Sequence, residues 1–215
     1  MNTVPMFPLS AVLFPHTPLL LRIFEPRYLT MIGRLLEEDD PQFGVVLIER
    51  GHEAGGGDQR SARGTMARLV EVTAGAEDLQ IVTVGGDRFT VDEWDDDDPY
   101  PQASITRLEG LEWNDDLLPL RTEAERIVRR VLARATEYGT TRWDADVELS
   151  DDHHEAIWQL AEIAPLGEFD RFALQNATTA GGLLREIIDR TLEIEPLLTA
   201  APIDDIEGLE GIDPL

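Results

Sequence analysis

Two adjacent histidines, His153 and His154, stand among three carboxylates in the segment DDHHE at residues 151–155. Histidines that share one metal ion on a helix are usually three or four residues apart, whereas adjacent histidines point in different directions. Acidic residues suit the start of a helix, because the helix dipole favours negative charge there. The segment is therefore predicted to begin a helix, with Ser150 and Asp151 as capping residues, and no metal site is expected.

Three further segments resemble ion or phosphate sites only in part. The acidic run WDDDDPY, residues 94–100, lacks the glycine and the bidentate glutamate of an EF-hand, so it is predicted to be a solvated turn. The loop GHEAGGGD, residues 51–58, lacks the lysine and the spacing of a P-loop and is predicted to join two strands. VGGDRF, residues 84–89, is predicted to be a bulge or a kink in a long strand. No cofactor is expected at any of them.

Nucleophilic chemistry has few residues available to it. The chain has no cysteine, and all 18 basic residues are arginine. Arginine cannot act as the base of a Ser-Lys dyad, because it keeps its proton at any pH that a protein tolerates. Only four serines occur, and none lies in a G-x-S-x-G sequence. The sequence therefore predicts a protein without catalytic residues, which is not an enzyme.

The charge balance excludes some partners by default. A total of 43 Asp and Glu against 18 Arg gives a formal net charge of -25. Such a chain repels nucleic acid and anionic membranes. The N-terminus has no basic region before its apolar residues, and no apolar run approaches the roughly 18 residues that span a bilayer. A cytoplasmic protein without nucleic-acid or membrane partners is expected, and the sequence leaves its oligomeric state open.

The segment RIFEPRY, which begins at Arg22, places three charges where an apolar run ends and a helix is predicted to begin. Glu25 precedes a proline and so favours extended geometry, which predicts a cap or ion-pair partner beside the helix start. Pro26 suits the first helical turn. Arg22 shares a strand face with Leu20 and Phe24, so it must reach the barrel rim or pair with a carboxylate. Arg22, Glu25 and Pro26 are predicted to form a structural corner.

The elements that would hold this corner fall into two groups. Short runs rich in Val, Ile, Leu and Thr, separated by Gly, Pro and Asp, predict an antiparallel sheet or small barrel with strands at residues 19–24, 42–50, 64–73, 79–91 and 102–109. One helix is predicted to follow Pro26. Apolar spacing of three and four then predicts four helices, at residues 117–139, 150–165, 167–177 and 181–198.

This change of pattern predicts the domain organisation. Residues 1–112 are expected to form the β-barrel subdomain and residues 113–200 a small helical bundle packed against it. Residues 201–215 are acidic with isolated aliphatics, and are expected to be a largely disordered tail.

Several segments in order resemble one family. FPLSAVLFPHTPLLLRIFEPRY, FGVVLIERG, GTMARLVEV, VGGDRFTV and DPYPQASITRLE closely resemble the N-terminal, substrate-binding domain of Lon proteases over residues 4–109, and DRFALQNATTAGGLLREIIDRTLE adds a weaker match. The resemblance implies an α+β fold, a PUA-like β pseudo-barrel with one inserted helix followed by a helical bundle. It also implies a stand-alone member, because the ATPase and Ser-Lys peptidase modules of a complete Lon protease are missing.

The resemblance also indicates candidate binding residues around an apolar groove beside the corner. Phe14, His16, Phe24, Arg27 and Tyr28 match or adjoin the family's signature and are predicted to contact a substrate or partner. His16 departs from the pattern, because relatives often have glycine at this position.

The leading hypothesis is a non-catalytic module that binds unfolded or exposed apolar polypeptide segments, or a protein of a quality-control system. An acidic exterior would select basic partners. Two alternatives stay open. One is a hydrolase related to peptidases by descent. The other is RNA binding by analogy with PUA-like folds, for which the only dense arginine cluster is Arg126, Arg129, Arg130 and Arg134.

Overall fold

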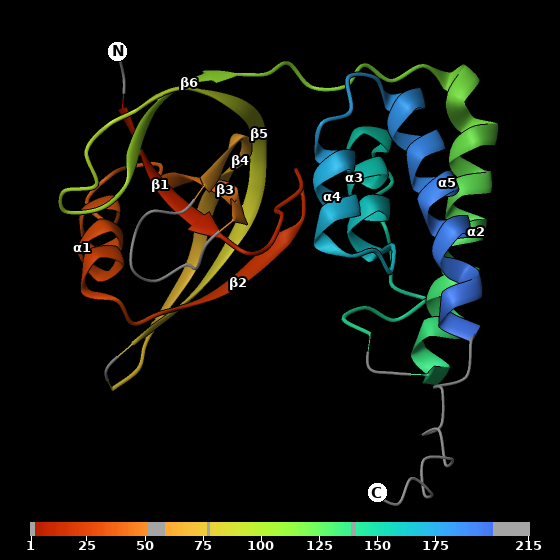
Figure 1. Cartoon of the computed structure of the whole chain (residues 1–215), viewed down its shortest axis with the longest axis horizontal. Coiled ribbons are helices and arrows are strands. Elements are labelled where there is room, and N and C mark those ends of the chain that lie inside the picture. Colours follow the sequence, from red (N-terminus) through yellow and green to blue (C-terminus); the bar gives the residue numbers. More distant parts are fainter. Residues whose placement is uncertain (1–2, 51–58, 77, 139–140, 200–215) are drawn as a thin grey trace, which may run out of the picture.

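The computed structural model describes residues 3–50, 59–76, 78–138 and 141–199, which form a β-barrel lobe and a helical lobe side by side (Figure 1). The barrel lobe contains helix α1 (Pro26–Leu35) and six strands, β1 (Thr3–Leu9), β2 (Pro18–Ile23), β3 (Gln42–Arg50), β4 (Gln59–Ala74), β5 (Leu79–Trp94) and β6 (Gln102–Arg107). The expected α+β pseudo-barrel with one inserted helix is confirmed.

The sheet closes on itself through its longest strands. Its order is β2-β5-β4-β3-β1-β6, and β6 also pairs with the second half of β5. All pairs are antiparallel except β1 with β3. β2 pairs with the first half of β5, and no other strand of the described chain pairs with β2. β2 therefore keeps one open edge.

The predicted bulge in VGGDRF is present where β5 crosses β4. Thr65 lies opposite Arg88 and Ala67 opposite Gly85, so β5 holds one residue more than β4 over this step. The backbone of Gly85 also exchanges hydrogen bonds with the β1–β2 loop: His16 N donates to Gly85 O (2.8 Å), and Gly85 N donates to Thr17 O (3.0 Å). The bulge thus fixes the loop that enters β2.

Strand β1 was not among the predicted strands. It contains Pro5 and Pro8, and proline within a run argues against a strand because it cannot donate a ladder hydrogen bond. β1 forms because it pairs with β3 and β6, and the local sequence of β1 does not reveal these partners.

The sequence also makes predictions for the acidic run and for the loop that follows β3. Within the acidic run, Asp97 pairs with Arg60 (2.6 Å), whose guanidinium lies over Trp94. The loop 51–58 lies outside the described residues.

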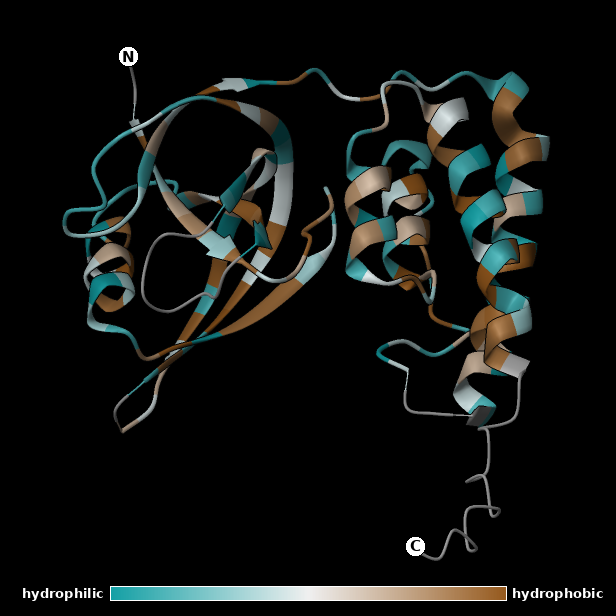
Figure 2. Cartoon of the chain, viewed as in Figure 1, coloured by the Kyte–Doolittle hydropathy of each residue, from teal (hydrophilic) through white to brown (hydrophobic). Residues whose placement is uncertain are grey.

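The helical lobe contains a short 3-10 helix η1 (Asp115–Leu117), then α2 (Leu118–Tyr138), α3 (His153–Ile163), α4 (Glu168–Gln175) and α5 (Ala180–Thr199). Figure 2 shows hydrophobic residues on the sides of these helices that face one another. The N-cap of α3 is Asp152, whose carboxylate accepts from His154 N (2.8 Å), so the predicted caps Ser150 and Asp151 are displaced by one residue or more. The predicted boundary at 112 and 113 lies between β6 and η1, and the predicted tail 201–215 lies outside the described residues.

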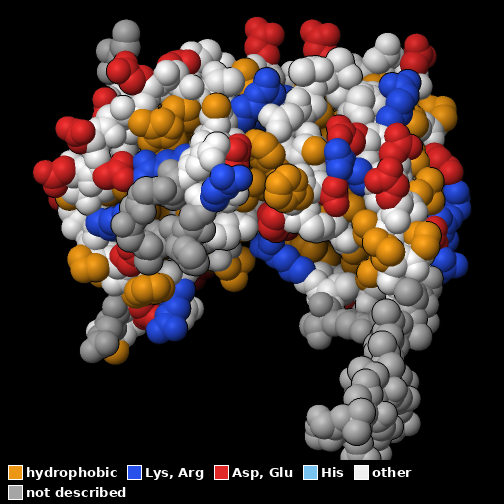
Figure 3. All heavy atoms as spheres, viewed as in Figure 1, with side chains coloured by type: hydrophobic (Ala, Val, Ile, Leu, Met, Phe, Trp, Pro, Cys, Tyr) orange, Lys and Arg blue, Asp and Glu red, His pale blue; other side chains and the backbone are white. Residues whose placement is uncertain are grey.

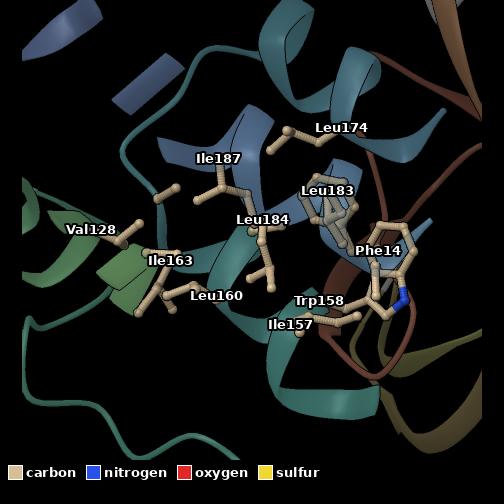
Figure 4. Packing of buried hydrophobic residues seen from close by; sticks show 14 of the residues in the cluster. Phe14, Val128, Ile157, Trp158, Leu160, Ile163, Leu174, Leu183, Leu184 and Ile187 are labelled. Atoms are coloured by element: carbon tan, nitrogen blue, oxygen red, sulfur yellow. The ribbon is translucent and has the colours of Figure 1, made fainter. Parts of the chain in front are cut away.

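The core of the helical lobe includes side chains from the barrel sequence. Val12 and Phe14, in the β1–β2 loop, are buried among residues of α2 to α5. Figure 4 shows Phe14 beside Trp158 of α3, and their ring centroids are 5.8 Å apart. The core of the helical lobe is therefore shared by both parts of the chain, and within the described residues the barrel has two further hydrophobic clusters of its own.

Buried polar groups surround this shared core. Arg171 of α4 donates to the carboxylate of Glu162 (2.5 Å) and to Val12 O (3.2 Å), and its guanidinium lies over the Phe14 ring. Gln175 donates to Leu13 O (3.1 Å) and to the hydroxyl of Thr65 (3.0 Å). Bonds of this kind depend on direction, so they fix the orientation of the lobes more strictly than apolar contact does.

Candidate binding groove

The corner RIFEPRY has the local structure that its sequence predicts. Glu25 is the N-cap residue of α1 in extended geometry, Pro26 opens the helix, and Ile23 ends the strand. The Glu25 side chain makes no capping bond and instead accepts from Arg27 Nε (3.0 Å). The Arg22 guanidinium binds the carboxylate of Asp78. Both charges are therefore paired, as a corner of strand and helix requires.

A groove of about 590 Å³ lies beside this corner and the open edge of β2, and is called here the β2 groove. Strand β2 supplies five of its twelve lining residues, and the others come from β1 and the loop after it, from the corner and α1, and, in one case, from the helical lobe. Its lining residues are Phe7, Leu9, Ala11, Leu19, Leu20, Leu21, Arg22, Ile23, Phe24, Glu25, Tyr28 and Arg142. Figure 3 shows the molecule hollowed on its lower side between the two lobes.

Two large apolar side chains on β2 and the residue after it project into solvent. Leu20 is 68% exposed and Phe24 is 65% exposed. They share a strand face with Arg22, while the alternate residues Leu19 and Ile23 point into the barrel and are buried. Exposed large apolar side chains beside a groove make it a candidate interaction site. Leu20 is not among the predicted contact residues, although strand alternation places it on the same face of β2 as Phe24.

The other predicted contact residues lie in different environments. Tyr28 is buried and stacks on Phe7 with ring centroids 4.0 Å apart, so it forms the floor of the groove. Arg27 is partly buried and lies over the Tyr28 ring. Phe14 is 0% exposed within the helical-lobe core, which places it away from the groove and leaves it no surface for a ligand. His16 is exposed, with Nδ1 3.8 Å from a Glu155 oxygen.

Arg142 reaches the groove from the helical lobe and could not be placed by sequence reasoning. It lies in the segment between α2 and α3, where its Nη1 is 3.1 Å from the buried carboxylate of Glu162. Its Nη2 also approaches Pro18 O at 3.5 Å. A single arginine after Thr141 carries no local signal for a contact with β2, because this contact depends on how the lobes pack.

The groove is lined mainly by apolar side chains with a few charged groups, a composition that suits binding. Its charged groups are Arg22, Glu25 and Arg142, and no serine, threonine, cysteine or histidine occurs among the described residues that line it. Elsewhere, His153 Nδ1 contacts Arg121 (3.2 Å) and His154 Nδ1 contacts Leu111 O (3.1 Å), so the two imidazoles face different partners. The described residues hold no group of three possible metal ligands.

The arginine cluster considered for RNA binding is paired with carboxylates. Arg126 binds Glu123 and Arg129 binds Glu125, in each case one helical turn away. Arg130 and Arg134 both bind Glu195 of α5. Two of these arginines pair within α2 and two join α2 to α5. The cluster therefore gives the RNA hypothesis no support.

The chain folds as a closed barrel joined to a helical lobe, with an apolar groove beside the open edge of β2. The chain belongs to the family described as the ATP-dependent protease La (LON) substrate-binding domain, whose sequence profile matches residues 3–189. The family implies a protein-binding role. No curated protein matches the chain significantly. In the described part of the chain, no helix is long and apolar enough to cross a membrane.

Solved structures of Lon N-terminal domains share the fold. A Lon N-terminal domain protein from Xanthomonas campestris is 24% identical, with a TM-score of 0.64 over 88% of this chain and 98% of that one. The N-terminal domain of a Mycobacterium avium complex Lon protease is 15% identical, with a TM-score of 0.63 over 89% of this chain and 99% of that one.

Proposed function

We propose that this protein is a non-enzymatic module that binds exposed apolar segments of unfolded polypeptides in the β2 groove. The observation that carries the proposal is the exposure of Leu20 and Phe24 beside the open edge of β2. Apolar side chains of an unfolded segment bury surface against these residues, and the segment's backbone can pair with the open strand edge. Folded proteins hide both features, so the groove selects for the unfolded state.

The acidic surface favours basic segments over acidic ones. A chain with net charge -25 attracts cationic polypeptides and repels anionic ones before contact is made. This attraction is screened by salt, whereas burial of apolar surface in the groove is not. Binding of a basic unfolded polypeptide is therefore expected to weaken as salt is added and to level off at the affinity of the apolar contacts.

The test is fluorescence anisotropy of a labelled, permanently unfolded polypeptide titrated with this protein, with a compact folded protein as the control probe. Phe24→Ser and Leu20→Ser remove exposed apolar side chains from the groove, and each is expected to weaken binding by about fivefold to tenfold. Phe169→Ser is the matched control, because Phe169 is 88% exposed on α4 and does not line the groove.

Equal losses from the Phe24 and Phe169 variants would show that binding is a general property of exposed apolar residues and would overturn the choice of groove. Saturable binding of the folded probe would overturn the preference for unfolded chains. A dedicated partner from a quality-control system remains the second form of the proposal. It is favoured if the wild-type protein binds neither probe at high micromolar concentration.

A further inference from the structure

A second and larger cavity, of about 960 Å³, lies between the barrel and the start of α5 and is called here the linker pocket. It runs beneath residues 108–117, which cross from β6 to α2 along the upper side of Figure 1. The barrel contributes Arg63 and Arg88, and the helical lobe contributes residues 177–181. The linker pocket shares no lining residue with the β2 groove.

The two arginines project from the same face of the barrel. Arg88 on β5 lies opposite Thr65 on β4, and Arg63 stands two residues before Thr65, so Arg63 and Arg88 are diagonal neighbours on that face. Arg88 Nη1 donates to Gln175 O (2.8 Å) and Ala177 O (2.6 Å), and Arg63 Nη1 donates to Asn176 O (3.3 Å). These carbonyls end α4, whose dipole places partial negative charge there.

Each guanidinium still has donors without a protein acceptor. Within the described residues, no carboxylate lies within 4.0 Å of Arg63 or Arg88, and the side-chain hydrogen bonds of each come from Nη1 alone. The remaining nitrogens of both side chains are not among the fully buried polar atoms that lack a partner. These N–H groups are therefore not completely buried, and both arginines line the linker pocket, with the Arg88 guanidinium over the Trp158 ring.

The positive charge of Arg63 and Arg88 is not balanced by a nearby carboxylate of the described residues. Burial, and after it the nearby charge of Arg63, lower the pKa of Arg88 to about 10. Both causes act against the charged form of the Arg88 side chain, and a negative group placed between the two arginines offsets both. The N-terminus of α5, at Ala180 in the same pocket, adds partial positive charge.

Four acidic lining residues, called here the acidic wall, limit which anion fits the pocket. Glu109, Glu112, Asp115 and Asp116 all line the linker pocket. These carboxylates repel a polyanion such as RNA and attract lysine or arginine side chains. A ligand that pairs with the two arginines and with the acidic wall carries one carboxylate at its end and positive charge on the residues before it.

We propose that the linker pocket binds the C-terminal carboxylate of a basic polypeptide segment, held by Arg63 and Arg88, with the basic side chains of that segment against the acidic wall. The inference rests on the proposed function, that the protein binds unfolded polypeptides, and it adds a second site with a defined chemical preference. The β2 groove then holds apolar segments, and the linker pocket holds a chain end.

The test uses three labelled peptides that share a Lys- and Arg-rich sequence and are titrated with the wild-type protein by fluorescence anisotropy. One has a free C-terminal carboxylate, one has an amidated C-terminus, and one is amidated with aspartate as its last residue. The free acid is expected to bind about tenfold more tightly than the plain amide, a difference of about 1.4 kcal/mol. The amidated aspartate peptide is expected to bind no better than the plain amide.

Arg63→Gln is expected to reduce the preference for the free acid to about twofold or less and to leave the affinity for the amide nearly unchanged. Arg68→Gln is the matched control, because Arg68 is an exposed residue of the same strand that does not line the linker pocket. Circular dichroism checks that both variants are folded.

Each outcome with the wild-type protein is informative without any variant. Equal binding of free acid and amide overturns this inference and leaves the proposed function intact. Binding of the aspartate amide as tightly as the free acid shows that any carboxylate is accepted, which overturns the preference for chain ends. If neither the acid nor the amide binds, this inference fails, and the proposed function is decided separately by the titration of the unfolded polypeptide.

Discussion

His16 has a backbone conformation that glycine adopts more easily than histidine does. Its φ is 58°, and its N–H donates to Gly85 O, so the turn after Pro15 is fixed by the barrel. The family resemblance singles out this position, because His16 stands where relatives often have glycine. The physical reason is the left-handed geometry of the turn. A contact of the exposed imidazole with a ligand stays a prediction.

Glu162 is the residue on which the buried polar network depends most. It is 5% exposed and pairs with Arg171, which is also 5% exposed. Without the Glu162 charge, the buried Arg171 keeps only the partly exposed carboxylate of Glu168, 3.5 Å from its Nε, as a charged partner among the described residues. Glu162→Gln is therefore expected to lower the free energy of unfolding by about 3 kcal/mol, as measured by urea denaturation.

The matched control for this prediction is Glu155→Gln on the same helix. The Glu155 side chain is 41% exposed, so its loss is expected to change the free energy of unfolding by less than about 0.5 kcal/mol. Equal, small effects of the two substitutions would contradict the assigned role of the Glu162–Arg171 pair.

At this scale the sequence predicts charges whose partners are near in the chain, and it does not predict distant pairs. Glu25 and Arg27 are two residues apart, and their pairing follows from the turn geometry. Arg171 contacts Val12 across 159 positions, and nothing in the local sequence of either residue indicates the contact. The same limit applies to Arg142 in the β2 groove.

Among the elements, strand β5 depends on a glycine at its bulge. A Cβ on Gly85 would lie 2.0 Å from Phe14 O, a backbone atom that cannot move without disturbing the β1–β2 loop. Gly85→Ala is therefore expected to lower the free energy of unfolding by about 2 kcal/mol or more. Thermal or urea denaturation measures the change.

The neighbouring residue provides the control. A Cβ on Gly86 would meet Met66 O at 3.6 Å, which is ordinary contact, so Gly86→Ala is expected to be within about 0.5 kcal/mol of wild type. If both substitutions are tolerated, the close approach between Gly85 and the Phe14 carbonyl does not constrain the fold.

Helices and most strands could be predicted because their apolar spacing is a local property. α1 begins at Pro26, and α3 and α4 lie within their predicted ranges. β1 could not be predicted, because its two prolines argue against a strand and only its pairing with β3 and β6 overrides them. The groove is expected beside the corner, and strand alternation places Leu20 on the exposed face of β2. The place of Phe14 in the other lobe depends on tertiary packing.

For the whole molecule, the shared core predicts that both lobes unfold together. Val12 and Phe14 belong to the core of the helical lobe, and Arg88 and Gln175 join barrel strands to the end of α4. Loosening one lobe exposes buried polar groups of the other, which couples their stabilities. Amide hydrogen exchange followed by mass spectrometry in rising urea is expected to show β3 and α5 losing protection at the same urea concentration.

Earlier loss of protection in α5 than in β3 would contradict this coupling and would show two units of independent stability. The change of sequence texture near residue 112 by itself predicts that second outcome, since the two halves of the chain differ so clearly in pattern. The prediction of two subdomains describes the order of elements along the chain. This measurement tests whether the two subdomains also unfold independently.

The position of Val12 and Phe14 also affects how the protein is made. Translation produces these two residues before any helix of the lobe whose core they complete, and their partners on α5 are among the last described residues to leave the ribosome. The barrel strands all precede Leu108, so they are complete before α2 is made. Until α3 and α4 emerge, Phe14 lacks the Trp158 ring and the Arg171 guanidinium that lie against it in the folded protein, so the unfinished chain exposes this apolar side chain to aggregation and to chaperones.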